Sequence, residues 1–359
     1  LTVVSTKTKN RIDQWITGQH IFDINDVMKK KLLLGLTVLG AASMLCGFDS
    51  AETADSLYQK MLDATTDASG ASMSMGMNLD AAINVSDGTT DSSLGITMSG
   101  TFDVNATMDP VATEVVGSMD LSALGQGQHM EMKSYSVTAE DGGLETYSFT
   151  KESTDDEGSW AYNKDSSIDM TSLMELSKSL TAADMADWGL TFTLAPEAAT
   201  VNGTECYELS TVIDSSTLDT VLKKVSELAG EDLTSDQDVA MAMQYLDGLK
   251  LNITYYVDAA TYLPVSMTMD MNDSDLTVLN SLIASALASE EGTSAELVLN
   301  DFSINATTSY GDVAAITVPQ EAIDAVAAGE ATSLDDVAEN LVADAETEAA
   351  EATTEAVAE

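Results

Sequence analysis

The sequence predicts an α+β domain built around an antiparallel sheet. Apolar and polar residues alternate over long stretches such as residues 94–108, which is the pattern of strands with one buried face. Asp141-Gly142-Gly143 is a hairpin turn between two such stretches, because glycine adopts positive φ at little cost. Amphipathic helical segments then stand between some of the later strands. This order favours α+β over a regular alternation of strand and helix.

An export signal precedes the domain. Three lysines at residues 29–31, an apolar stretch over residues 32–45 and small or polar residues near its end are the three zones of a secretory signal. The apolar stretch is shorter than the roughly 20 residues that cross a bilayer as a helix. We therefore predict a signal peptide over residues 28–45. Residues 1–27 are polar and aperiodic. We interpret them as an unstructured, over-extended gene start, the alternative being a true extension.

Cys46 is the predicted lipidation site. Bacterial lipoprotein signals resemble Leu-(Ala/Ser)-(Gly/Ala)-Cys, and the lysines, the length of the apolar core and Gly47 fit this pattern. Ser43 and Leu45 depart from it, which leaves ordinary cleavage and free secretion as the alternative. With a lipid on Cys46, residues 46–54 form a tether. The domain is then held at the extracellular face of the cell membrane.

The folded domain is predicted over residues 55–322 and begins with a helix. Residues 55–64 place Leu57, Met61 and Leu62 on one helical face. A meander of strands follows, each with alternating apolar and polar residues or a hairpin turn at its end. These strands are predicted at residues 73–79, 94–108, 115–121, 130–140, 144–151 and 159–162.

The second half of the domain mixes helices and strands. Amphipathic patterns predict helices at residues 170–188, 216–229, 238–246 and 275–288. Alternating patterns predict strands at residues 190–194, 205–213, 249–257, 262–271, 296–306 and 313–318.

The acidic composition limits the classes of partner. The chain has 60 Asp and Glu against 14 Lys and Arg, a net charge of −46, and no basic residue follows Lys250. Such a surface repels phosphates, so we predict no binding of nucleic acid. Residues 335–359 are nearly all Ala, Glu, Asp, Thr and Val, and residues 323–359 are taken together as a C-terminal tail. They can bury little surface, and we predict an acidic disordered tail.

The residues predict neither an enzyme nor a metal site or cofactor. His129 is the one histidine after the signal, and we interpret it as a surface residue at the start of a strand rather than a general base. Acidic loops at Asp236 and Asp270 lack the glycine and glutamate of a calcium-binding EF-hand. Cys206 lies in an alternating stretch and is interpreted as a buried free thiol. A carboxylate-based hydrolase stays an alternative, because so many acids offer many pairs.

Short motifs spread along the domain resemble one family. They are the helix at residues 57–61, the Met-rich strand 73–79, Trp160-Ala161-Tyr162, VNGTECYEL at residues 201–209, VDAATYLPV at residues 257–265 and Ile316-Thr317-Val318-Pro319. Together they resemble Gram-positive bacterial lipoproteins of unassigned function that have a LolA/LppX-like, lipoprotein-carrier fold. The resemblance implies an antiparallel, incompletely closed β-barrel, a half-barrel, with helices covering its concave apolar face.

The resemblance also implies a cavity for a lipid or an acyl chain. The candidate lining residues are alternating side chains of two strands: Met73, Met75, Met77, Leu79, Ile96, Met98 and Phe102. Methionine suits such a surface because its thioether is flexible and polarisable. The predicted function is therefore a lipid-anchored, non-catalytic binder or carrier of a hydrophobic ligand. The alternative is an envelope lipoprotein that contacts other proteins, in which the methionines pack a filled core.

Overall fold

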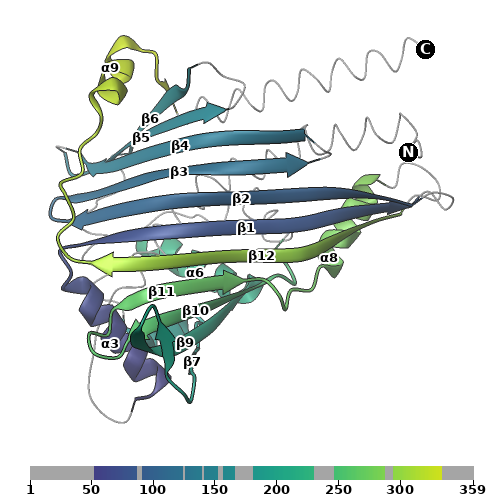
Figure 1. Ribbon diagram of the computed structural model, residues 1–359, viewed down its shortest axis with the longest axis horizontal. Helices are drawn as coiled ribbons and strands as arrows, with labels where there is room; N and C mark the ends of the chain where they lie inside the picture. Colours follow the sequence, from purple (N-terminus) through teal and green to yellow (C-terminus); the bar gives the residue numbers. More distant parts are fainter. Residues whose placement is uncertain are drawn as a thin grey trace.

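The domain is built on one open sheet of thirteen strands (Figure 1). The computed structural model describes residues 52–86, 91–123, 126–139, 141–152, 157–165, 181–229, 246–287 and 294–333. The strand order is β13-β6-β5-β4-β3-β2-β1-β12-β11-β10-β9-β7, and β8 pairs with β9 beside this path. Because β13 and β7 lie at opposite ends of the order, the barrel is not closed. The predicted α+β class with a half-barrel sheet is confirmed.

The first half of the sheet is the predicted antiparallel meander. Each strand pairs with the next one along the chain, and Gly142 has φ of 90° in the turn between β4 and β5. The strands are β1 (Gly70–Ser86), β2 (Asp91–Met108), β3 (Val111–Ala123), β4 (Gln126–Thr138), β5 (Leu144–Glu152) and β6 (Ser159–Asp165).

The second half joins the first through its longest strand. β12 (Ser294–Tyr310) pairs with β1 on one side and with β11 on the other, so the two halves form one continuous surface. β13 (Thr332–Ser333) adds a short parallel pairing to β6. The remaining strands are β7 (Phe192–Leu194), β8 (Ala199–Val201), β9 (Thr204–Asp214), β10 (Lys250–Asp258) and β11 (Pro264–Asp270).

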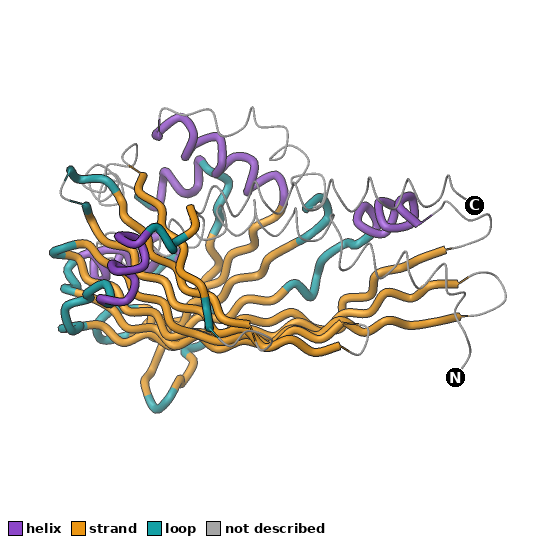
Figure 2. Tube along the Cα trace, turned by 90° about the horizontal axis from the view of Figure 1, so that it is seen from above, coloured by secondary structure: helices purple, strands orange, loops and turns teal. Residues whose placement is uncertain are grey.

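Helices cover part of the concave side of the curved sheet (Figure 2). Side chains of α3 and α5 pack against β9 and β10, α6 adds Val221 to the same cluster, and α8 packs against one end of β1 and β12. α9 instead contacts aromatic side chains of β4 and β6 on the opposite side. The helices are α3 (Ala54–Thr66), α5 (Ala182–Asp187), α6 (Ser215–Ala229), α8 (Thr277–Leu287) and α9 (Gln320–Ala328).

α3 follows directly from its sequence pattern. The Thr53 hydroxyl accepts a hydrogen bond from the Ser56 amide and caps the first turn. Leu57, Met61 and Leu62, predicted on one face, are almost completely buried. Burying three such side chains stabilises the domain by roughly 1.5–3 kcal/mol each.

The segment after β12 differs from its prediction. Residues 313–318 were expected to form a strand, but they have no regular structure. They carry Ile316 and Val318 onto a cluster that includes Tyr135 and Trp160. The alternating pattern correctly marks residues that pack on one side, but it does not require a partner strand. The described chain also continues through α9 and β13, past residue 322, where the predicted domain ended.

Several predicted segments lie outside the described residues. They include Cys46 with the signal and most of the tether, the predicted helix at residues 238–246, most of the helix at 170–188, and residues 334–359 of the predicted tail. Only the end of the 170–188 segment is described, where α5 is closed on its N-terminal side by a capping box of Thr181 and Asp184.

Candidate ligand-binding face

The register of the strands gathers the predicted lining residues on one face of the sheet. Met77 of β1 lies opposite Gly100 of β2 and Ile304 of β12. Met75 lies opposite Phe102 and Ala306 in the same way. Since alternate residues of a strand share a face, these rows continue along all three strands. We call this side of the sheet the apolar face.

The apolar face carries no charge over a wide area. Along β10, β11, β12, β1, β2, β3 and β4, the described residues that share the face with Met77 include no Asp, Glu, Lys or Arg. The chain as a whole has a net charge of −46. In so acidic a protein, a face without charged side chains can pack against apolar groups without burying an unpaired charge.

Two packed clusters lie toward the ends of the apolar face. In one, Leu57 and Met61 of α3 are completely buried against Leu209 and Val257 of the sheet. In the other, Ile283 of α8 packs on side chains at the far end of β1, β2 and β12. Ile96, one of the predicted lining residues, belongs to the edge of this second cluster. It therefore supports α8 as well as facing the sheet surface.

Between the clusters lies a row of side chains that we call the methionine band. It consists of Met73, Met75, Met77, Leu79, Met98 and Phe102. All six are half-buried, and none belongs to a packed cluster of the described residues. The described helices therefore leave the middle of the apolar face less covered than its ends.

Phe102 lies flat in the floor of this band. A Cβ atom added at Gly117 would stand 2.3 Å from Cδ1 of Phe102, and one added at Gly100 would stand 2.9 Å from Cε2. The ring thus occupies the space that side chains at both glycines would fill. Because neither glycine has a side chain, the Phe102 ring can lie close to the backbones of β2 and β3.

Toward β5 the same face becomes polar, and Glu152 at the end of β5 is the charged residue that this strand adds to it. Ser134 of β4 and Ser148 of β5 lie opposite each other with hydroxyl oxygens 3.3 Å apart. Ser136 and Thr146 form the next pair, at 3.2 Å. We call these four residues the hydroxyl strip. Their pattern in the sequence does not distinguish them from other serines and threonines, although the position of the Asp141-Gly142-Gly143 turn indicates which residues face each other.

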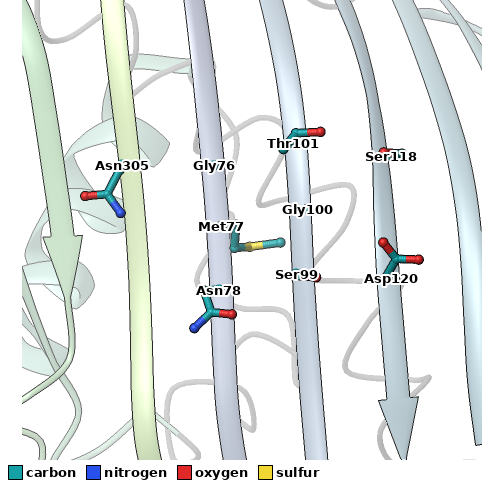
Figure 3. A pocket seen from close by; sticks show the side chains of 9 residues that line it. All are labelled: Gly76, Met77, Asn78, Ser99, Gly100, Thr101, Ser118, Asp120 and Asn305. Atoms are coloured by element: carbon teal, nitrogen blue, oxygen red, sulfur yellow. The ribbon is translucent and has the colours of Figure 1, made fainter.

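A separate hollow of about 350 Å³ lies on the opposite face of the sheet, the face on which α9 packs further along (Figure 3). Its lining is mainly polar, and Gly76 in its floor has open space where a side chain would stand. Met77 is the one predicted lining residue that borders it. The lining residues are Gly76, Met77, Asn78, Ser99, Gly100, Thr101, Ser118, Asp120 and Asn305. That the methionine band lines a ligand cavity therefore stays a prediction.

The described residues do not assemble a metal centre. No group of three or more His, Cys, Asp or Glu side chains among them could hold an ion. His129 is exposed, as predicted. Its Nδ1 atom lies 2.8 Å from Oδ1 of Asp120, which the register places directly opposite it on β3. The sequence did not reveal this carboxylate partner.

No helix in the described part is long and apolar enough to cross a membrane.

Cys206 is a buried free thiol, as predicted. It is completely buried in β9, and burial raises the pKa of its thiol. A raised pKa keeps the sulfur protonated at neutral pH, and the thiol is a poor nucleophile. Cys206 therefore has a packing role rather than a chemical one.

The fold and this face define an α+β protein with an open antiparallel sheet and helices over an uncharged apolar side. The chain belongs to DUF6612, a family of unknown function, whose model matches residues 53–327. Among curated proteins, a search finds no match to this chain.

Solved structures with a similar arrangement share little sequence with it. Lipoprotein LppX of Mycobacterium tuberculosis is 15% identical, with 74% of this chain and 98% of that chain covered and a TM-score of 0.30. LprF of Mycobacterium bovis is 14% identical, with 74% and 96% covered and a TM-score of 0.34. A DUF1329 family protein of Desulfovibrio piger is 11% identical, with 74% and 96% covered and a TM-score of 0.22. Similarity of this degree does not extend to function.

Proposed function

We propose that this protein is an extracellular, lipid-anchored, non-catalytic binder or carrier of a hydrophobic ligand, and that the methionine band contacts the ligand. The observation that carries the proposal is the uncharged, half-buried band in the middle of the apolar face. The chain as a whole carries 60 Asp and Glu residues and a net charge of −46. Their exclusion from this band is explained by a requirement for apolar contact.

The residue types in the band suit a ligand of variable shape. Methionine side chains are unbranched and polarisable, so they repack around different apolar groups at low cost. Phe102, flat over Gly100 and Gly117, supplies a firm floor among them. An acyl chain fits this combination because it needs apolar contact along its length and few directional bonds.

The anchor is part of the same proposal. A lipid on Cys46 would hold the domain at the membrane from which a hydrophobic ligand comes. The described chain begins at Glu52, just before α3, so only a short tether separates Cys46 from the folded domain. Labelling cells with a clickable palmitate analogue, followed by mass spectrometry of the mature N-terminus, tests this step. An unmodified Cys46 would overturn the anchor and leave the binding site untouched.

The binding proposal is tested by uptake of a neutral fluorescent apolar probe, with native mass spectrometry of protein purified from its own host. Met77→Lys places a charge in the band, whereas Asn78→Lys places the same charge one residue away on the opposite face. We expect the first variant to lose at least tenfold in probe affinity, because an unpaired charge in an apolar site costs several kcal/mol. The second variant serves as the control and should bind as the parent does.

A second function is favoured by the two packed clusters that flank the band. If the core is filled throughout, the protein would be an envelope lipoprotein that contacts other proteins and carries no ligand. The same experiment distinguishes the two. Absence of a co-purifying lipid, together with no probe uptake by the parent protein, would defeat the carrier and support the second function.

A further inference from the structure

We infer that the ligand is a neutral acyl lipid whose head carries hydroxyl groups, and that this head lies on the hydroxyl strip while its acyl chains lie on the methionine band. The inference rests on the proposed function and adds the class of the ligand and its direction on the sheet. It is carried by the way one face changes from apolar to hydroxylic between β2 and β5 without acquiring a basic side chain.

The two surfaces are continuous. Phe102 of β2 lies opposite Gly117 of β3, which lies opposite Met132 of β4. Ser134 follows two residues further along β4 on the same face, about 7 Å away. A ligand lying across the band therefore reaches the hydroxyl strip without crossing a packed cluster of the described residues.

The hydroxyl strip suits a neutral polar head. A serine or threonine hydroxyl both donates and accepts a hydrogen bond, so the four side chains can pair with the hydroxyl and ester oxygens of a glycerolipid. In the structure these hydroxyls pair with each other, Ser134 with Ser148 and Ser136 with Thr146. Each pair can turn toward a ligand at little cost, because one polar contact replaces another.

Charge excludes the common anionic lipids. A phosphate head buried on this face would need a basic partner, and the described residues of the face from β10 to β4 include no Lys or Arg. Beyond β4 the same face carries Glu152 of β5, opposite Met130 and hydrogen-bonded to Gln128. Its carboxylate would repel a phosphate and does not repel a neutral hydroxyl.

The inference is tested by competition. A neutral fluorescent apolar probe is bound to the full mature chain and displaced with dioleoylglycerol or with dioleoyl phosphatidylglycerol, which carry the same acyl chains. We expect dioleoylglycerol to displace the probe at about tenfold lower concentration. In the double variant Ser134→Ala with Ser148→Ala, that preference should fall about three- to tenfold, because two hydrogen-bonding groups are lost. Each displacement is expressed relative to the affinity of that protein for the probe.

Ser99→Ala with Ser118→Ala removes two hydroxyls from the opposite face and is the matched control. This control should keep the preference for the neutral lipid. Equal displacement by both lipids, or an unchanged preference in the strip variant, overturns the inference and leaves the proposed function standing. A parent protein that takes up no probe overturns the proposed function, and the inference with it.

Discussion

The Nζ atom of Lys60 lies 4.6 Å from the centroid of the Tyr262 ring, so a cation–π contact joins α3 to the turn between β10 and β11. The same ammonium is paired with Glu52, just before the helix. Tyr262 has a positive φ of 61° and its ring is stacked on Tyr207, with centroids 6.4 Å apart. These contacts hold the start of α3 against the sheet.

We expect Lys60→Met to lower the melting temperature by several degrees, since it removes both the ion pair and the cation–π contact. The control is Lys223→Met, which breaks an exposed pair with Asp219 on α6. An exposed pair of this kind contributes little, so the control should melt close to the parent. Thermal unfolding followed by circular dichroism provides the measurement. Equal melting temperatures for the two variants would show that the contact at Tyr262 does not stabilise the domain.

Gly117 should not tolerate a side chain. A Cβ atom there would stand 2.3 Å from the Phe102 ring and 2.5 Å from the carbonyl oxygen of Thr101, and the backbone carbonyl cannot move aside easily. We expect Gly117→Ala to lower the free energy of unfolding by about 1–3 kcal/mol in urea titrations. Gly95→Ala in β2 is the matched control, because nothing lies within 4 Å of its Cβ position. A loss of equal size in both variants would contradict the role of Phe102.

Alkaline pH should destabilise the fold through tyrosines whose hydroxyl groups are shielded from water. Burial raises the pKa of Tyr255 to about 12, from the ordinary value of 10.0. Below pH 10 the side chain is protonated in both states and its contribution is complete. Between about pH 10 and 12 only the unfolded state ionises, so the free energy of unfolding falls as pH rises, by about 1.4 kcal/mol per pH unit for this group.

Tyr255→Phe should therefore make this alkaline decline shallower by the same slope. Denaturant titrations from pH 8 to 12 measure it, and the difference between variant and parent below pH 9.5 provides the internal control. Burial also raises the pKa of Tyr58 and Tyr310, so a residual decline is expected in the variant. Parallel curves for variant and parent across the whole range would disprove the assignment to Tyr255.

α9 should depend on one small side chain. Ala322 is completely buried in the cluster that contains Tyr135 and Trp160. Ala322→Glu places an unpaired carboxylate there and should either cost about 3 kcal/mol or more or detach the helix from the sheet. Ala328→Glu, at an exposed position of the same helix, is the control. Limited proteolysis of residues 312–333 distinguishes them, and equal cleavage rates would contradict the packing of α9.

The thiol of Cys206 should be unreactive until the protein unfolds. In a Cys46→Ser background it is the single thiol of the chain, which has two cysteines in all. Because it is completely buried and its pKa is raised, we expect no reaction with Ellman's reagent at pH 8 in native buffer and one equivalent in 6 M guanidinium. Rapid modification of the native protein would show that β9 opens readily.

The strand pattern predicted most of the fold because its information is local. The alternation around Met75 and Phe102 indicates which residues share a face, and the Asp141-Gly142-Gly143 turn sets the register of β4 and β5. Residues 313–318 show the limit of that information. Their apolar residues do pack on one side, yet no strand pairs with them.

The candidate site was predictable only in part. The sequence identifies Met73 to Leu79 as one apolar row, since the spacing is strict. It cannot indicate that Gly117 lies under the Phe102 ring, or that Asp120 pairs with His129, because both contacts depend on the register between strands. The Lys60 contact with Tyr262 joins residues far apart in the chain and has no local signal.

The sequence by itself determined the α+β class, the run of antiparallel strands, the apolar side of each strand, the buried face of α3 and the acidic composition of the chain. Tertiary structure alone decided that β12 pairs with both β1 and β11, that α9 covers the aromatic side, and that the methionine band lies between two packed clusters. The physical reason is that periodicity and turn chemistry act over a few residues. The choice of neighbouring strand and covering helix depends on the packing free energy of segments that meet only when the whole chain has folded.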